Sequence, residues 1–168
     1  MELVNKLTVL RSTTGDEMDS EVKKNAYLYC KFRDEQFALY DDFAKQHGMM
    51  MKTLLVVNAL YYAEDGMTQR DICQRTLESK QTVNLIIKNL LKDRYVTVTE
   101  MKENKRMKRV RMTKEGRSSC EKVVRHITWA EDTAMSMFSP EEQKTLIDLS
   151  RIFTKNLTML IHEEMEET

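Results

Sequence analysis

The scarcity of turn-forming residues is the feature that most constrains the fold of this chain. Only one proline and four glycines occur in its 168 residues. Turns between many short strands need those residues, so the composition argues against an all-β chain and for a mainly helical one. The length fits one domain, with or without extensions.

Two further properties of the sequence bear on the cellular location of the protein. Its longest apolar stretches fall far below the roughly 18 residues of a membrane span, so we expect no membrane partner. No basic-then-apolar leader opens the sequence, and we therefore expect a cytoplasmic protein.

The charges cancel in total but are unevenly distributed. The chain has 27 basic and 27 acidic residues, yet the segment 68–117 holds 14 basic and six acidic ones, a net charge of +8. The remainder carries −8. A concentrated positive segment is typical of a protein that binds a polyanion, although a solvated charged surface would have the same composition.

Long helices are expected at both ends of the chain. Residues 19–46 carry apolar side chains in two rows, which predicts burial on two sides, the second of them by another subunit. His47-Gly48 should end this helix. A further helix is expected over 49–64, another from Lys114 to about Met137, and a last one from Ser139-Pro140. We expect this last helix to bury one apolar row, namely Leu146, Leu149, Phe153, Leu157 and Leu160.

The middle of the chain predicts a helix-turn-helix. Thr68 and Asp71 have the spacing of a capping box, which predicts a short helix over 69–75. Ser79 should cap the next helix, over 80–93. At 100° per residue its apolar residues Val83, Ile86, Ile87 and Leu90 fall on one side, and Lys80, Gln81, Asn84 and Lys88 fall on the other.

The residues that favour β structure follow this helix in the sequence. Residues 95–99 are β-branched or aromatic, and residues 109–112 alternate basic and apolar side chains, with a polar loop between them. We interpret the two strands as a β-hairpin. Seven of the thirteen residues from Lys102 to Lys114 are basic, so a polyanion that enters between these charges would relieve their mutual repulsion.

A helix-turn-helix followed by a basic hairpin suits duplex DNA. Long amides such as Gln81 and Asn84 can pair bidentately with adenine, and Lys80 and Lys88 can reach guanine or phosphate. Arginine of the hairpin can enter the narrow minor groove. The residues that we expect to contact DNA are Ser79, Lys80, Gln81, Thr82, Asn84 and Lys88 of the helix, and Lys105, Arg106, Lys108 and Arg109 of the hairpin.

The ordered set of motifs resembles the MarR family of bacterial transcriptional regulators. It comprises residues 68–73, 79–84, 90–93, 104–106 and 110–116, where the family pattern is close to D-x-R-x-x-x-v-x-L-T-x-x-G, and Phe138-Ser139-Pro140-Glu141-Glu142. The resemblance extends over about residues 24–160.

This resemblance implies a single domain over 1–168. It would consist of dimerisation helices at 20–47 and 114–165 and of a winged helix-turn-helix at 49–113. It also implies a homodimer on a near-palindromic operator, with recognition helices in the major groove and wings in the minor groove. Members of the family usually repress, and a ligand or an oxidant usually relieves the repression, so a small-molecule effector is a further expected partner of unknown identity.

The sequence departs from the family pattern at three positions. Asn104 replaces the aspartate that braces the wing arginine, which makes the geometry of Arg106 less certain. Arg94 replaces the usual glycine after the recognition helix, so its C-cap is built otherwise or is strained. Leu77 replaces a small residue in the turn.

Four residues could line an effector pocket, namely Tyr29, Cys30, Tyr61 and Trp129. Cys30 lies beside Tyr27 and Tyr29. The resemblance implies a possible sensing role, because the hydroperoxide-sensing branch of the family uses a reactive cysteine near tyrosine hydroxyls in this region. A buried small hydrophobe is the alternative. The aromatic residues and the thirteen methionines can equally be core residues.

The remaining chemistry points away from catalysis and cofactors. Cys30, Cys73 and Cys120 are single cysteines without a C-x-x-C motif, and no H-x-x-x-H pair occurs, so neither a metal nor another cofactor is expected. No nucleophile–base spacing or Gly-rich phosphate loop indicates an enzyme. Two alternatives to a DNA-binding regulator remain. One is a winged-helix protein-interaction module, and the other is RNA binding, which exposed aromatics on the basic surface would favour.

Overall fold

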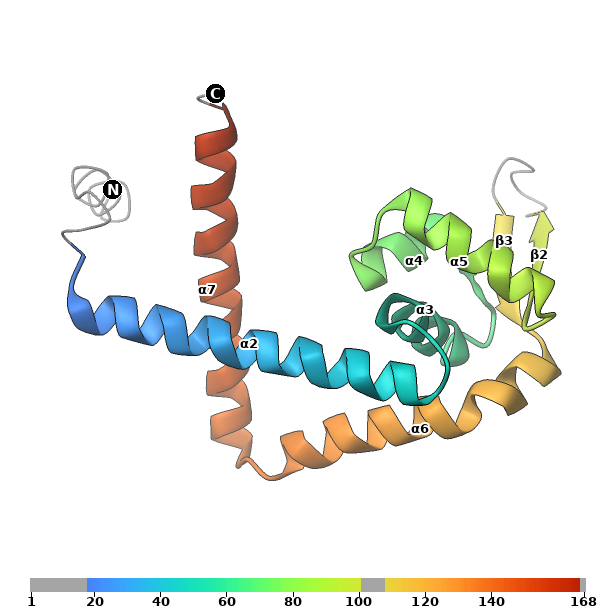
Figure 1. The fold of residues 1–168 in the computed structure, drawn as a ribbon, viewed down its shortest axis with the longest axis horizontal. Helices are drawn as coiled ribbons and strands as arrows, with labels where there is room; N and C mark the ends of the chain where they lie inside the picture. Colours follow the sequence, from blue (N-terminus) through green and yellow to red (C-terminus); the bar gives the residue numbers. More distant parts are fainter. Residues whose placement is uncertain (1–17, 101–107, 167–168) are drawn as a thin grey trace. The chain divides into compact units, whose positions relative to one another are not determined.

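The computed structural model describes residues 18–100 and 108–166, with side chains up to residue 162 (Figure 1). Its helices are α2 (Ser20–Gln46), α3 (Met51–Tyr61), α4 (Gln69–Thr76), α5 (Lys80–Lys92), α6 (Lys114–Ser136) and α7 (Pro140–Glu166). Its strands are β1 (Met67–Thr68), β2 (Val96–Glu100) and β3 (Lys108–Met112). The expectation of a mainly helical chain with a small β wing is confirmed. The chain divides into two compact units, Met1–Val56 and Val57–Thr168.

Helix α2 of the first unit begins and ends where the sequence predicts. The Asp19 carboxylate accepts a hydrogen bond from the backbone N–H of Glu21 at 2.7 Å and so caps the first turn. At the other end Gly48 has φ +72°, the left-handed conformation that glycine adopts without a steric penalty. Ala44 is the buried residue of this helix, whereas Tyr27, Phe32 and Leu39 are exposed.

In the second unit, α4 and α5 pack against each other as a helix-turn-helix. Thr68 and Asp71 form the predicted capping box at the start of α4, and Ser79 caps α5. The predicted apolar side of α5, Val83, Ile86, Ile87 and Leu90, is buried. Leu77 in the turn between the helices has φ +56°, so a leucine there occupies a left-handed conformation.

The sheet has three strands in the order β1-β3-β2, and the predicted hairpin is therefore only part of it. Besides pairing with β2, strand β3 pairs with β1, where Met67 lies opposite Val110 and Thr68 opposite Arg109. The expectation that β structure is confined to the hairpin was wrong. A strand of two residues is too short to show the alternation by which strands are recognised in a sequence.

The wing packs its apolar side on α5, because Val96, Val110 and Met112 point into the core. The chain then turns from Met112 through Thr113, whose hydroxyl accepts from the N–H of Gly116 and starts α6. Arg94 has φ +61°, so of the two alternatives expected after α5 the structure has the strained one.

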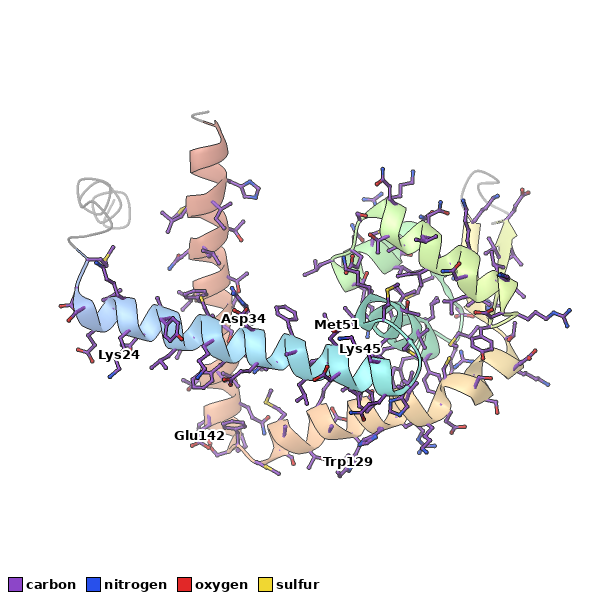
Figure 2. The ribbon with its side chains drawn as sticks, viewed as in Figure 1. Lys24, Asp34, Lys45, Met51, Trp129 and Glu142 are labelled. Atoms are coloured by element: carbon purple, nitrogen blue, oxygen red, sulfur yellow. The ribbon has the colours of Figure 1, made fainter. Side chains whose placement is uncertain are left out.

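Helix α7 begins with the predicted capping box. Ser139 N–H donates to the Glu142 carboxylate at 2.8 Å, and the Glu142 N–H donates back to the Ser139 hydroxyl (Glu142 is labelled in Figure 2). The predicted burial of its apolar row was wrong for a single chain, since Leu149 is 61% exposed and Leu146, Leu157 and Leu160 are exposed as well. An amphipathic row specifies that a covering surface exists, but not that the same chain supplies it.

Within residues 18–100 and 108–166, no helix is both long and apolar enough to cross a membrane.

Candidate nucleic-acid interface

The start of α5 is held in place by its own cap and by α4. The Ser79 hydroxyl oxygen accepts from the Thr82 N–H at 3.1 Å and lies 2.9 Å from the Thr82 hydroxyl. The Gln69 side-chain amide donates to the Lys80 carbonyl at 3.0 Å and ties α4 to the first turn of α5. Ser79 and Thr82, both predicted contact residues, therefore also orient the helix.

The outward side of α5 carries the predicted polar residues. Lys80, Gln81, Asn84 and Lys88 are exposed, opposite the buried residues that pack on the core. Leu85 and Lys92 are exposed on the same side, and neither is among the DNA contacts expected from the sequence. The helical-wheel spacing could have found them, because Gln81, Leu85, Lys88 and Lys92 fall within about 60° of one another at 100° per residue.

The wing contributes Lys108, which is exposed at the start of β3 opposite Glu100. Arg109, another predicted contact, donates from Nη1 to the backbone carbonyl of Asp65 at 3.3 Å. Arg111 donates to the same oxygen at 3.0 Å, and its Nη2 lies 3.6 Å from the Asp65 carboxylate. The two arginines thus brace β3 against the turn that precedes β1. Lys105 and Arg106 lie outside the described residues.

The capping box of α4 lies at the same junction. The Asp71 carboxylate accepts from the Thr68 hydroxyl at 2.7 Å and from the Thr68 N–H at 3.2 Å. These hydrogen bonds, helped by the positive charges of Arg70 and Arg109, lower the pKa of Asp71 below its ordinary value. The first strand, the first helix of the helix-turn-helix and the wing are therefore linked by charge and hydrogen bonds.

A hollow of about 410 Å³ lies between α5 and the wing. Its lining includes Lys88 and Leu91 from α5 and Val98, Glu100 and Lys108 from the two wing strands. Lys88 of the helix and Lys108 of the wing border the same concavity, together with the carboxylate of Glu100.

The four predicted effector-pocket residues fall into both units. Tyr29 and Cys30 are on α2 in the first unit, whereas Tyr61 and Trp129 are on α3 and α6 in the second. The Tyr61 ring has the Arg117 guanidinium 5.6 Å from its centroid, and Arg117 donates to the Tyr61 carbonyl. Trp129 is 63% exposed on α6 (Figure 2). The pocket that these four residues would form stays a prediction.

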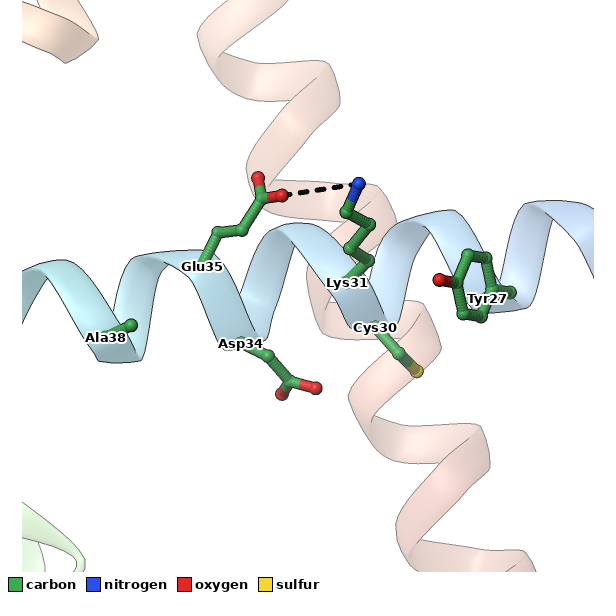
Figure 3. A pocket seen from close by; sticks show the side chains of 6 residues that line it. All are labelled: Tyr27, Cys30, Lys31, Asp34, Glu35 and Ala38. Atoms are coloured by element: carbon green, nitrogen blue, oxygen red, sulfur yellow. Dashed lines mark ion pairs between the residues drawn. The ribbon is translucent and has the colours of Figure 1, made fainter.

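Cys30 borders an open hollow along one side of α2 (Figure 3). Tyr27 lies one turn away, and Lys31 pairs with Glu35 at 3.6 Å along the same helix. Cys30 is half-buried, in contrast to Cys120, whose burial raises the pKa of its thiol and keeps it protonated. Oxidant sensing by Cys30 stays a hypothesis. The described residues hold no cluster of three or more side chains suited to a metal.

Sequence comparison finds a family match in the middle of the chain. Residues 47–107 match the sequence model of the MarR family, roughly a third of the chain. No curated protein sequence matches the chain.

Solved structures resemble the fold at low sequence identity. MepR of Staphylococcus aureus in complex with DNA is 22% identical, with a TM-score of 0.63 over 77% of this chain and 96% of that one. AbsC of Streptomyces coelicolor, a MarR family transcriptional regulator, is 15% identical, with a TM-score of 0.71 over 84% and 97%. The PcaV transcriptional regulator of S. coelicolor, solved with its natural ligand, is 18% identical, with a TM-score of 0.62 over 82% and 96%. Residues 47–107 thus resemble the MarR family in sequence, and the fold of the chain is similar to that of these solved regulators.

Proposed function

We propose that the protein is a sequence-specific regulator of transcription that binds double-stranded DNA as a homodimer on a near-palindromic operator. Recognition helix α5 would lie in the major groove and the basic wing in the adjacent minor groove. The single observation that carries this proposal is the two-sided character of α5. Its apolar side is buried on the core, and its outward side presents Lys80, Gln81, Asn84 and Lys88 to solvent.

The chemistry of that outward side fits base edges better than it fits an acidic protein surface. Glutamine and asparagine offer a donor and an acceptor together, which matches the N6 and N7 atoms of adenine in the major groove. Lysine reaches guanine or phosphate, and no carboxylate of α5 opposes either interaction, since residues 80–92 contain none. The same surface lacks aromatic side chains, which single-stranded RNA would require for stacking.

The related structures support DNA as the partner. MepR was solved in complex with DNA, and AbsC is described as a transcriptional regulator. The family match covers α4, α5 and strand β2, and so includes the helix that would enter the major groove.

Exposed apolar rows support the homodimer. Single chains rarely expose a long apolar row to water, because each buried methylene is worth about 0.8 kcal/mol. Helix α7 exposes one such row, and α2 exposes Tyr27, Phe32, Phe37 and Leu39. A second copy of the chain, which brings the same rows, would cover them isologously. Sedimentation equilibrium at micromolar concentration should give twice the mass of 19.9 kDa.

The proposal also covers whether the protein represses or activates transcription, and which signal changes its activity. We propose repression, relieved by a small molecule or an oxidant. A transcriptional regulator of similar fold, PcaV, was solved in complex with its natural ligand, which supports a small-molecule effector. A reporter gene downstream of the selected operator should be less active when the protein is expressed. Activation of the reporter would reverse the sign of the regulation but leave DNA binding intact.

The test of DNA binding is a salt titration. A duplex selected by the protein from a random pool is labelled, and Kd is measured by fluorescence anisotropy at increasing KCl. Release of counterions predicts that log K falls linearly with log salt, by about 0.9 for each phosphate neutralised. The absence of any salt dependence, or no enrichment of sequences, would overturn the proposal and favour a protein-interaction module.

A further inference from the structure

We propose that Leu85 reads the C5-methyl group of a thymine in each half-site, about one or two base pairs from an adenine read by Gln81. This inference rests on the proposed function, since it concerns the surface of α5 that would enter the major groove. It assigns a specificity-determining role to an apolar residue that lies among polar residues on the outward side of the helix.

The position of Leu85 is the first argument. It is 58% exposed, and it lies on the outward side of α5, away from the core residues Val83, Ile86 and Leu90. Gln81 is its neighbour one turn earlier and Lys88 its neighbour one turn later. A leucine at this place is therefore surrounded by the residues that are best suited to base edges and phosphates.

The direction of the side chain is the second argument. Side chains of a helix lean toward its N-terminus, so Leu85 leans toward the turn that carries Gln81. The N-terminal part of a recognition helix is the part that meets base edges. Because Ser79 and Gln69 fix this end of α5, the leucine is presented on a well-supported element.

The chemistry of the major groove supplies the third argument. Among the groups that base pairs display there, the thymine methyl is the apolar one, and leucine offers no hydrogen bond to any other. A scattered exposed leucine needs no explanation by itself. Leu85 differs because every neighbour on its side of the helix is polar. A duplex bound to this side would bury Leu85, even at a base pair that has no methyl group.

The spacing of the two residues defines the base step. Residues four apart on a helix have Cβ atoms about 5–6 Å apart. Bases of one strand follow at 3.4 Å, so the thymine lies about one or two base pairs from the adenine. An A·T-containing step in each half-site satisfies both side chains together.

The experiment removes the methyl group and leaves the hydrogen-bonding pattern unchanged. In the selected duplex each thymine is replaced in turn by deoxyuridine, and Kd is measured for the full-length protein. Loss of one buried methyl, about 0.8 kcal/mol, corresponds to about a fourfold weaker Kd. We expect this loss at one thymine of each half-site, and we expect Leu85→Ala to bind the thymine and uracil duplexes equally at that position.

A second leucine provides the matched control. Leu91 is 40% exposed, but it lies about 120° around α5 from Leu85, where it lines the hollow beside the wing. Leu91→Ala should retain the full sensitivity to uracil, even if its affinity changes. Wild-type protein that binds the operator but is indifferent to uracil in both half-sites would overturn the role of Leu85, and so would a fourfold effect that persists in Leu85→Ala. The salt titration tests DNA binding independently, so the two failures can be told apart.

Discussion

Gly66 lies directly against the backbone carbonyl of Val110, so closely that a Cβ atom at position 66 would overlap this oxygen. Gly66 also has φ +72°, which disfavours any other residue. The turn at residues 63–66 thus approaches the wing strand β3 at the point where β1 pairs with it. The same turn supplies the Asp65 carbonyl that accepts from Arg109 and Arg111, so the position of the wing depends on this contact.

Replacing Gly66 should therefore destabilise the protein more than replacing another glycine with the same φ. Gly48 is also at φ +72°, but a Cβ there would meet nothing within 4 Å. We expect Gly48→Ala to cost about 1 kcal/mol for the left-handed conformation alone. Gly66→Ala should cost about 1–3 kcal/mol more, because the backbone must move. Urea unfolding measures both, and equal losses for the two variants would refute the close approach.

Leu77 should be a site where substitution stabilises the chain. It has φ +56° and is 91% exposed, so its side chain contributes little burial to offset the strained backbone. Asparagine tolerates this conformation better, and Leu77→Asn should raise the stability by roughly 0.5–1 kcal/mol. Leu77→Ala serves as the control, since it removes the side chain and keeps the strain. If alanine stabilises as much as asparagine, the backbone conformation is not the cause.

The capping box of α4 should make stability depend on acid pH. The folded-state pKa of Asp71 lies below its unfolded value, so its hydrogen bonds stabilise the fold above that value, about 3.9. This stabilisation is lost as the pH falls through the folded-state pKa. We expect Asp71→Asn to be less stable than wild type at pH 7, and the difference to shrink toward pH 3. Denaturant unfolding between pH 3 and pH 7 measures this difference in the free energy of unfolding. Thr68→Val, which removes the donor hydroxyl, should likewise reduce the dependence of the free energy of unfolding on pH.

Arg106 lies outside the described residues, and its role can be tested directly. If it contacts a phosphate, Arg106→Ala should weaken binding to all duplexes and reduce the salt slope by about one unit. If it reads the shape of the minor groove, the loss should vary with the operator sequence. Lys122→Ala on the exposed side of α6 removes the same charge and should leave the slope unchanged. An Arg106 variant that behaves like this control would exclude both roles.

The amides of α5 should determine base preference. Gln81→Ala or Asn84→Ala is expected to relax the preference at one base position by about 1–3 kcal/mol, because each removes a bidentate partner of adenine. Competition binding with single-base variants of the operator measures this preference. Asn89→Ala, an exposed amide on the same helix but about 140° from Asn84, should leave base preference as it is. A uniform loss over all bases would instead assign Gln81 and Asn84 to phosphates.

Much of the fold could be predicted because its signals are local. Capping residues such as Thr68, Ser79 and Ser139 satisfy backbone groups within three residues, so their spacing alone marks the helix starts. The buried side of α5 follows from helical periodicity in the same way. The opposite side of that helix carries the residues that we expect to face DNA, and their contacts with DNA stay a prediction.

The sequence by itself thus determined the order of helices, the two-sided character of α5 and the positive charge of the segment around it, all of which depend on neighbours along the chain. The tertiary structure decided the third strand, the bracing of Arg109 and Arg111 on Asp65 and the exposure of the apolar rows on α7. Those features depend on which distant segments meet. A two-residue strand or a backbone carbonyl carries no pattern of its own, so pairing and packing, rather than local propensity, determine where they lie.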